Sequence, residues 1–498
     1  MNRHTIVAAA ATAALVPAIA WGDARELRDQ GDWDRVIQLE VSPADEPEFP
    51  YQHRFTYSPH ELLPGNSINW YLRAYPEESM FWRAWNKATG EEEFDKFYGF
   101  GTPISELPQE ELANHGRRFG HVFKDYIIPA AKRRETDWGI RYEQVRGEET
   151  VSFLLPEFQG MRSFARLGSL GVRHAIAEGR YADAIEHLRT MYRLGRDCGA
   201  EPLIVCGLIG VAITQMAGSG VTDLIAAPDA PNLYWALTEL PAIPVRFEEA
   251  VRLELELGPR MFEALDDPDN AERTAAEWNA VWRRVGALSD ILDGLGGLQR
   301  TPEPWEAIGA ELLPTAAGLT GYSHAKRRLV EWGFDADEIE AMAVGQVLSI
   351  YSARVYKIAT DAFQKGWSLP YPEGRRVMYE AEGALRSMAP LSNSDNRELL
   401  PIATMIVPAI QATQTAQYRC ARQLAVLRVI EALRMHAARN DGRLPRSLAE
   451  VACVPIPDNP MTGAPFTYHR SGRQGVIDLP AWEGWVTATR YEITSRLS

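Results

Sequence analysis

Apolar residues recur every three or four positions through most of the chain beyond residue 65, which is the spacing of one face of a helix. The clearest run spans 161–195 and is interrupted at Gly179. Because glycine readily takes the left-handed conformation that ends a helix, this run predicts two antiparallel helices joined by a short turn. Their apolar faces comprise Met161, Phe164, Ala165, Gly168, Val172 and Ala175, and then Tyr181, Ala184, Ile185, Leu188, Met191, Tyr192 and Gly195.

The stretch Leu203–Ala217 is apolar nearly all round, which predicts a helix that is buried on every side. Its 15 residues are too few to span a bilayer, so we expect the central helix of a protein core. Gly207 and Gly210 would let neighbouring helices approach closely. The sequence Gly218-Ser219-Gly220 predicts the end of this helix.

Two more long helices are predicted towards the C-terminus. The first covers 335–366, because Asp335 with Glu338 three residues later matches a capping box and Gly366 can end the helix. The second covers roughly 411–439 and stops before Gly442.

The last residues predict a small appended unit. Ser447 and Glu450 match a second capping box over a short helix. The segments 465–470 and 475–480 alternate weakly around a glycine-rich turn and predict a β-hairpin.

These elements together predict an all-α fold with a small C-terminal β-hairpin. The segment 179–195 is similar to one helix of a tetratricopeptide repeat, but the roughly 34-residue recurrence of that repeat is missing. We therefore expect an irregular, TPR-like array of helix hairpins around the buried central helix 203–217. The expected division of the chain is a signal peptide at 1–20, an extended N-terminal segment at 21–65, a helical domain at 66–410, and a long helix with a helix and β-hairpin cap at 411–498.

The N-terminus has the pattern of a secretory signal peptide. Arg3 precedes an apolar run from Thr5 to Ala20, and Ala18-Ile19-Ala20 fits a small-x-small cleavage site. This pattern predicts a periplasmic or extracellular protein with no transmembrane helix in the mature chain, and an uncleaved N-terminal anchor is the alternative. The formal net charge of −15 argues against a nucleic-acid partner, since phosphate binding needs a basic face.

Four cysteines are present, and an oxidising compartment would permit two disulfides. Consecutive helices would bring Cys198 near Cys206, and the terminal unit would bring Cys453 near Cys420; buried free thiols fit the sequence equally well. Neither a CxxC pair nor a histidine grouping with ligand spacing occurs, so no metal and no cofactor is expected.

Aromatic residues crowd into 66–101, and this stretch holds most of the candidate binding residues. Exposed rings beside carboxylates would stack on sugars or hold a peptide, whereas buried rings would pack two helices onto the core. The same two interpretations apply to the turn ETDWG at 135–139. The candidate binding residues are Trp70, Tyr71, Trp82, Trp85, Asp137 and Trp138.

Six stretches of the chain carry a resemblance to known proteins: TDWGIRYE (136–143), GRYADAIEHLRTMYRL (179–194), PNLYWALTELPAIP (231–244), GFDADEIEAMAVGQVLSIY (333–351), GRLPRSLAEV (442–451) and DNPMTGAPFTY (458–468). Together they resemble a functionally uncharacterised family of exported bacterial helical proteins, and that family implies no reaction. The last two stretches are also similar to the end of a type II secretion pseudopilin, although the apolar N-terminal helix with a prepilin cleavage site is missing.

No catalytic constellation is recognisable in the sequence, and helix pairs typically form concave binding surfaces. The first hypothesis is therefore a non-catalytic interaction or scaffold protein of the cell envelope, with an envelope protein or a glycan as partner. The alternative is a secreted hydrolase acting on polysaccharide or peptide, in which the aromatic residues of 66–101 line a subsite.

Overall fold

A computed structural model describes residues 33–75, 96–99, 101–142, 156–261, 263–270, 272–282, 322–388, 401–481 and 488–496. The chain divides into two compact units. Unit 1 comprises 1–18, 141–154 and 248–414, and unit 2 comprises 19–140, 155–247 and 415–498. The predicted signal peptide at 1–20 lies outside the described residues.

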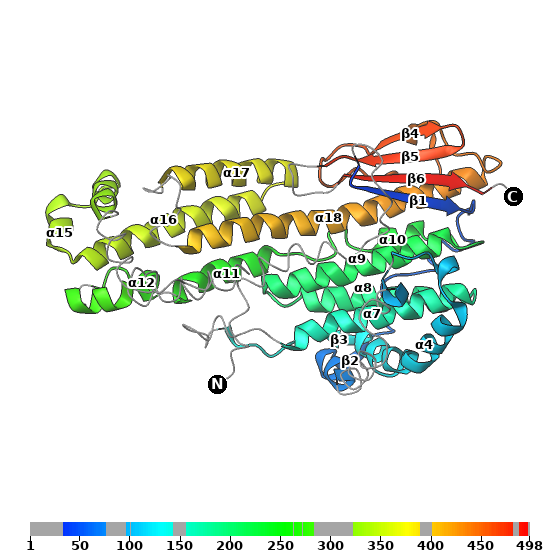
Figure 1. Ribbon diagram of the computed structural model, residues 1–498, viewed down its shortest axis with the longest axis horizontal. Coiled ribbons are helices and arrows are strands. Elements are labelled where there is room, and N and C mark those ends of the chain that lie inside the picture. Colours follow the sequence, from blue (N-terminus) through cyan, green and yellow to red (C-terminus); the bar gives the residue numbers. More distant parts are fainter. Residues whose placement is uncertain are drawn as a thin grey trace, which may run out of the picture. The chain divides into compact units, whose positions relative to one another are not determined.

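The prediction of an all-α fold is wrong, because two sheets accompany the helices (Figure 1). One sheet has the strand order β1-β6-β5-β4, and the other pairs β2 (Leu63–Asn66) with β3 (Arg133–Glu135). Strand β1 (Arg35–Val41) lies in the segment 21–65, for which only an extended N-terminal segment was predicted. It pairs in parallel with β6 (Thr489–Ser495), at the other end of the chain, and its side chains Ile37, Leu39 and Val41 are buried in the hydrophobic core.

The C-terminal hairpin is confirmed. Strand β4 (Thr467–Ser471) pairs antiparallel with β5 (Gln474–Leu479) across a turn in which Gly472 has a φ of +62°. The short helix before it is a single 3-10 turn, η4 (Leu448–Glu450), and Ser447 makes no capping bond through its side chain. Instead, Glu450 accepts a hydrogen bond of 2.7 Å from the amide of Arg446.

Unit 2 contains η1 (Ile104–Glu106), α4 (Gln109–Val122), η2 (Phe123–Ile127), α5 (Ile128–Ala131), α7 (Pro156–Ala177), α8 (Tyr181–Gly199), α9 (Ile204–Ala226) and α10 (Tyr234–Glu239). The predicted helix hairpin is α7 and α8, and it is confirmed. Gly179, with a φ of +70°, and Arg180 donate backbone hydrogen bonds to Ile176 (3.0 Å) and Ala175 (2.8 Å). These two bonds form the Schellman motif that ends α7.

Helix α9 is the predicted central helix, and its burial is confirmed. It does not end at Gly218-Ser219-Gly220 but continues to Ala226. These three residues are buried within the helix, and a Cβ on Gly218 would lie 2.7 Å from the end of the Gln423 side chain, so their small size fits close packing rather than a helix end. Among the described helices, α9 alone is long and apolar enough to cross a membrane, and 78% of its most apolar window is buried inside the protein.

Unit 1 contains α11 (Glu248–Met261), α12 (Glu263–Asp266), α15 (Ala336–Ala341), α16 (Val344–Trp367), α17 (Tyr371–Met388) and the start of α18 (Pro401–Ala438), whose later part belongs to unit 2. Asp335 caps α15 as predicted by accepting the amides of Asp337 and Glu338. The single helix predicted over 335–366 is nevertheless broken, because Met342 is extended with a ψ of 152°. Helices α16 and α17 lie side by side (Figure 1), and a Cβ on Gly374 would meet the carbonyl of Gly366.

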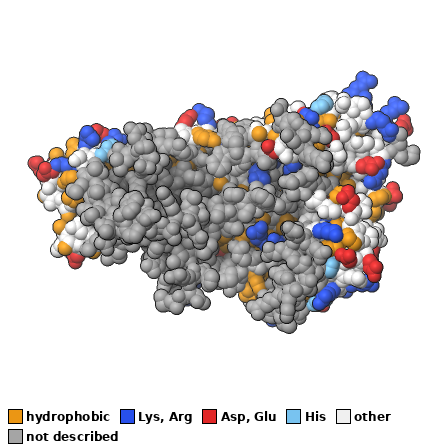
Figure 2. All heavy atoms as spheres, viewed as in Figure 1, with side chains coloured by type: hydrophobic (Ala, Val, Ile, Leu, Met, Phe, Trp, Pro, Cys, Tyr) orange, Lys and Arg blue, Asp and Glu red, His pale blue; other side chains and the backbone are white. Residues whose placement is uncertain are grey.

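Charged side chains of both signs are interspersed on the described part of the face shown in Figure 2. No single-sign field extends across that part of the surface.

Candidate functional site

A line of polar side chains runs along one face of α8, at the helical spacing of three and four residues. This line is covered by two non-helical segments of the same unit, 54–61 and 132–138, and its inner residues Thr190, Arg193 and Asp197 are buried. We call the line and its covering partners the α8 polar seam. It consists of Tyr57, Glu61, Tyr71, Lys132, Thr136, Glu186, Arg189, Thr190, Arg193 and Asp197.

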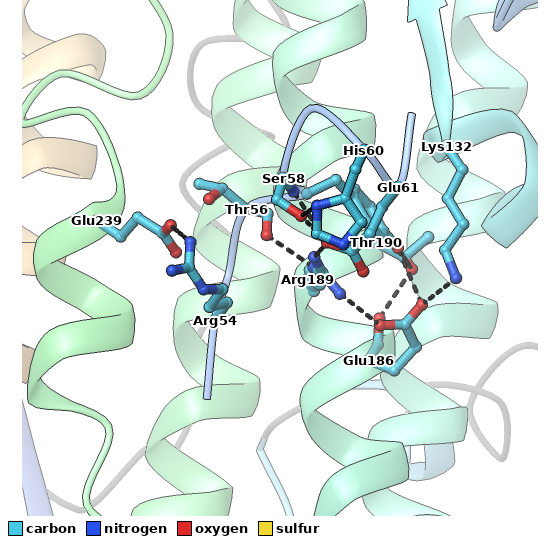
Figure 3. Close-up of polar contacts among 11 residues, drawn as sticks. Arg54, Thr56, Ser58, His60, Glu61, Lys132, Glu186, Arg189, Thr190 and Glu239 are labelled. Atoms are coloured by element: carbon cyan, nitrogen blue, oxygen red, sulfur yellow. Dashed lines mark hydrogen bonds and ion pairs between the residues drawn. The ribbon is translucent and has the colours of Figure 1, made fainter. Parts of the chain in front are cut away.

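At the outer end of the seam, Arg189 holds the segment 54–61 against the helix (Figure 3). Its guanidinium lies 2.5 Å from Glu61 Oε2 and 3.4 Å from Glu186 Oε2, and its Nε donates to the carbonyl of Thr56 at 2.9 Å. The Tyr57 ring stacks on the same guanidinium, with its centroid 3.9 Å from the central carbon. Each of the three guanidinium nitrogens of this arginine therefore donates to a partner within the protein.

The segment 54–61 has its own turn at Ser58. Both the amide and the hydroxyl of Ser58 donate to Glu61 Oε2, at 2.9 and 2.7 Å, and the hydroxyl also contacts His60 Nδ1 at 3.1 Å. A nucleophilic triad needs the imidazole between the hydroxyl and the carboxylate, whereas here the hydroxyl lies between the other two groups. Partial burial opposes ionisation of Glu61, but its bonds with Arg189 and Ser58 outweigh burial and lower its pKa to about 2. Ser58, His60 and Glu61 therefore stabilise the turn and attach it to Arg189.

At the inner end of the seam, Asp197 is the centre of a buried network. Its Oδ2 accepts the Tyr71 hydroxyl at 3.0 Å, and its Oδ1 accepts Thr136 Oγ1 at 3.0 Å and lies 2.7 Å from Arg193 Nε. Only 1% of Asp197 is exposed, so burial raises its pKa, while Arg193 favours the charged form. Arg193 also donates to the carbonyl of Arg133 at 2.8 Å and so connects α8 to β3.

Four of the six predicted binding residues gather at this inner end. Tyr71 is fully buried, and Trp138 Nε1 donates to the carbonyl of Asp197 at 3.4 Å. The carboxylate of Asp137 accepts the amide of Gly139 at 2.8 Å, as the structural interpretation of this turn expects. The Trp70 ring contacts two guanidinium groups: its centroid lies 4.4 Å from the central carbon of the Arg133 guanidinium and 5.0 Å from that of the Arg73 guanidinium. The remaining two, Trp82 and Trp85, lie outside the described residues.

Sequence reasoning missed Asp197 and Arg193, around which these residues gather. The available signal was the spacing of Glu186, Arg189, Arg193 and Asp197 along one helix face. Such a line is normally solvated. Only the covering segments, which lie far away in the sequence, make it an interior feature.

Two further buried arginines hold neighbouring segments of the chain through backbone carbonyls. Arg173 on α7 lies 3.4 Å from Asp223 and donates to the carbonyls of Lys96, Gly99 and Thr102. Arg434 on α18 lies 2.9 Å from Glu431 and donates to the carbonyls of Ser42 (3.0 Å) and Ala230 (2.6 Å). The buried ion pairs between α7 and α9, within α8 and within α18 thus each hold a neighbouring segment in place.

All four cysteines are free thiols, so neither of the two disulfides considered from the sequence is formed. Cys198, Cys206 and Cys420 are buried, and burial raises the pKa of Cys420 to about 12. A thiol with such a high pKa is unreactive at neutral pH. Within the described part of the chain, no group of three or more His, Cys, Asp or Glu side chains is placed to hold a metal ion.

We expect the attachment of residues 45–61 to weaken in acid. The pKa values of Glu61 and Asp45 are lowered in the folded protein, so the stability that they add is complete above their ordinary values of 4.5 and 3.8 and is lost as the pH falls. Burial likewise lowers the pKa of His53 below 6.5, so protonation of this imidazole opposes folding in the same direction. Hydrogen exchange of peptides from 45–61, corrected for intrinsic rates, should show protection that begins to fall below about pH 6.5, where His53 would be protonated in the unfolded chain, and that falls further from about pH 4.5 towards pH 2 as Glu61 and Asp45 are protonated. Peptides from α9 serve as the control, and equal changes in both would contradict the prediction.

No protein family, curated protein or solved structure was found to match this chain.

Proposed function

We propose that the chain is a non-catalytic, exported interaction protein of the cell envelope, in which a helical scaffold holds non-helical loops in fixed positions for a partner. Export is inferred from the N-terminal signal pattern of the sequence. The interaction role is inferred from the way in which the polar side chains of unit 2 are used.

The observation that carries this proposal is the α8 polar seam. Its carboxylates are paired with arginines and hydroxyl groups of the same chain. Glu61 forms an ion pair with Arg189 at 2.5 Å, and Asp197 forms one with Arg193 at 2.7 Å. A general acid or base must reach a substrate proton at hydrogen-bond distance. Asp197, at 1% exposure, holds the fold together instead.

The hydrolase alternative makes a different demand on the same residues. A sugar subsite needs an open aromatic face beside a carboxylate that can reach the glycosidic bond. Here Tyr71 is buried, Trp138 points its Nε1 to the Asp197 carbonyl, and the Asp137 carboxylate bonds within its own turn. These contacts favour a structural use of the three residues.

The proposal is tested by affinity capture from the native envelope fraction after mild chemical cross-linking. The wild-type chain is compared with Arg189→Met, which removes the contacts to Glu61, Glu186 and Thr56. We expect one or more envelope proteins to be enriched with wild type and lost with the variant, while hydrogen exchange of α9 shows that the variant remains folded.

Two results would overturn the proposal. One is release of soluble sugars or peptides from envelope material by the purified chain, which would establish a hydrolase. The other is equal capture of partners by wild type and Arg189→Met, which would show that partner binding does not depend on the position of the segment 54–61. Mass spectrometry of the purified chain tests export, since cleavage after Ala20 is expected; an unprocessed chain recovered from the cytosol would contradict it.

A further inference from the structure

Two aromatic side chains of unit 2 face solvent on the segment that leads into the α8 polar seam. Phe49 is 66% exposed and Tyr51 is 48% exposed. The Tyr51 ring centroid lies 6.1 Å from that of Trp235, which is on α10 and partly buried. We call Phe49, Tyr51 and Trp235 the aromatic patch. Exposed aromatic groups of this kind are typical of protein interaction sites.

The segment that carries the patch is fastened along its length. Asp45 lies 2.7 Å from the Arg439 guanidinium, and Glu46 Oε1 accepts a hydrogen bond of 2.5 Å from Trp235 Nε1. Arg54 forms an ion pair with Glu239 at the end of α10 (Figure 3). The amide of Gln52 donates a hydrogen bond to the carbonyl of Phe49 and so closes a turn. The aromatic patch is therefore preorganised, and a partner does not have to order the loop on binding.

The charges around the patch are predominantly negative. Four carboxylates lie on or beside the segment that carries the patch, against the two guanidinium groups of Arg54 and Arg439. Three of the four are paired with these guanidinium groups: Glu239 with Arg54, and Asp45 and Glu46 with Arg439. Glu48 is exposed and forms no ion pair with the described residues. A basic partner would meet an attractive field here, and an acidic one would be repelled. The four carboxylates are those of Asp45, Glu46, Glu48 and Glu239.

The geometry of the rings disfavours a sugar. Stacking on a pyranose needs a flat, open ring face, but the Tyr51 and Trp235 rings are tilted by 50° to each other. The Arg54 guanidinium also covers the Tyr51 ring, 5.1 Å from its centroid. The indole Nε1, which would donate to a hydroxyl, is already used on Glu46.

We propose that the aromatic patch binds a peptide segment of a partner protein that is both basic and apolar, with a Lys or Arg side chain on Glu48 and aliphatic side chains against Phe49 and Tyr51. This inference rests on the proposed function and adds the chemistry of the partner and the place at which it binds.

The test uses the full-length chain and fluorescence anisotropy with synthetic peptides. The probe is a short peptide of lysine, leucine and serine in equal parts. Two further peptides replace lysine by glutamate or leucine by serine, and an N-acetylglucosamine oligomer represents the glycan class. We expect the lysine–leucine peptide to bind best and to bind more weakly as salt is raised.

The variants locate the site. Phe49→Ala and Tyr51→Ala should each weaken binding of the lysine–leucine peptide about tenfold, as expected for aromatic hot-spot residues. Glu48→Lys should weaken it and reduce the salt dependence. The matched control is Leu72→Ala, because Leu72 is also an exposed apolar side chain of unit 2, at 40%, and should leave the affinity unchanged.

Four outcomes overturn the inference: equal or tighter binding of the glutamate peptide, tighter binding of the oligosaccharide, equal weakening by Leu72→Ala, or absence of binding by every probe. If the envelope capture still enriches a partner that is lost with Arg189→Met, the proposed function stands and only the chemistry assigned to the aromatic patch is wrong. If that capture also fails, the proposed function falls with it.

Discussion

Replacing Arg434 by methionine is expected to destabilise unit 2 by about 3–5 kcal/mol, the usual cost of removing one partner from a buried ion pair. Arg434 and Glu431 are both fully buried, and the guanidinium lies 2.9 Å from the carboxylate. Burial raises the pKa of Glu431, while Arg434 favours its charged form. The variant leaves this carboxyl without its counter-charge, and the carbonyls of Ser42 and Ala230 without a donor.

The measurement is urea unfolding with hydrogen exchange of β1 and β6 as the readout, so that the unfolding of unit 2 is observed separately. The control is Arg180→Met, since the pair of Arg180 with Asp183 is 43% and 54% exposed and should contribute less than about 1 kcal/mol. The double variant Glu431→Leu with Arg434→Met should recover much of the loss, because no charge then remains buried. Equal losses for Arg434→Met and Arg180→Met would refute the importance of this pair.

The second large effect is expected at the crossing of α8 and α9. A Cβ on Gly210 would lie 2.5 Å from the carbonyl oxygen of Gly195 and 3.0 Å from the amide nitrogen of Gly199. Both are backbone atoms in the middle or at the end of a packed helix, so neither can move aside as a flexible side chain could. Gly210→Ala should therefore cost about 3 kcal/mol, at the upper end for one added methyl group.

Gly120→Ala is the matched control, because Gly120 is also in a helix of unit 2 and a Cβ there would meet nothing within 4 Å. Alanine is the better helix former by about 1 kcal/mol, so this variant should be neutral or stabilising. Thermal or urea unfolding of the two variants compares their free energies of unfolding and tests the prediction. A Gly210→Ala protein as stable as Gly120→Ala would mean that the helices can separate at this crossing without cost.

Several elements were predictable because their causes are local. Gly179 ends α7, Asp335 caps α15, and the glycine turn at 472 closes the β4–β5 hairpin, each through bonds within a few residues. The burial of α9 was equally readable, because no polar face exists on that stretch. Even so, the break before α16 escaped prediction, since the apolar spacing continues across Met342.

The candidate site was only half visible in the sequence. Trp70, Tyr71, Asp137 and Trp138 stood out by composition. In the structure Tyr71 donates to the carboxylate of Asp197 and Trp138 donates to its backbone carbonyl, while Trp70 lies on Arg133, whose carbonyl accepts from Arg193. Nothing local distinguishes that carboxylate, Asp197, from an acid on a solvated helix face. Its burial depends on Tyr71 and Thr136, which are 126 and 61 residues away in the chain.

The sequence by itself determined the helical periodicity, the turns and the all-apolar central helix, because these follow from neighbouring side chains and from backbone preferences. Tertiary structure alone decided that the strand 35–41 joins the far end of the chain in parallel, with Gln38 bonded to Glu492 across 454 positions. It also decided that the charged face of α8 is interior and that Phe49 and Tyr51 remain outside. The physical reason is that the burial of a side chain depends on which distant segment packs over it. The periodicity within one segment does not show which other segment that will be.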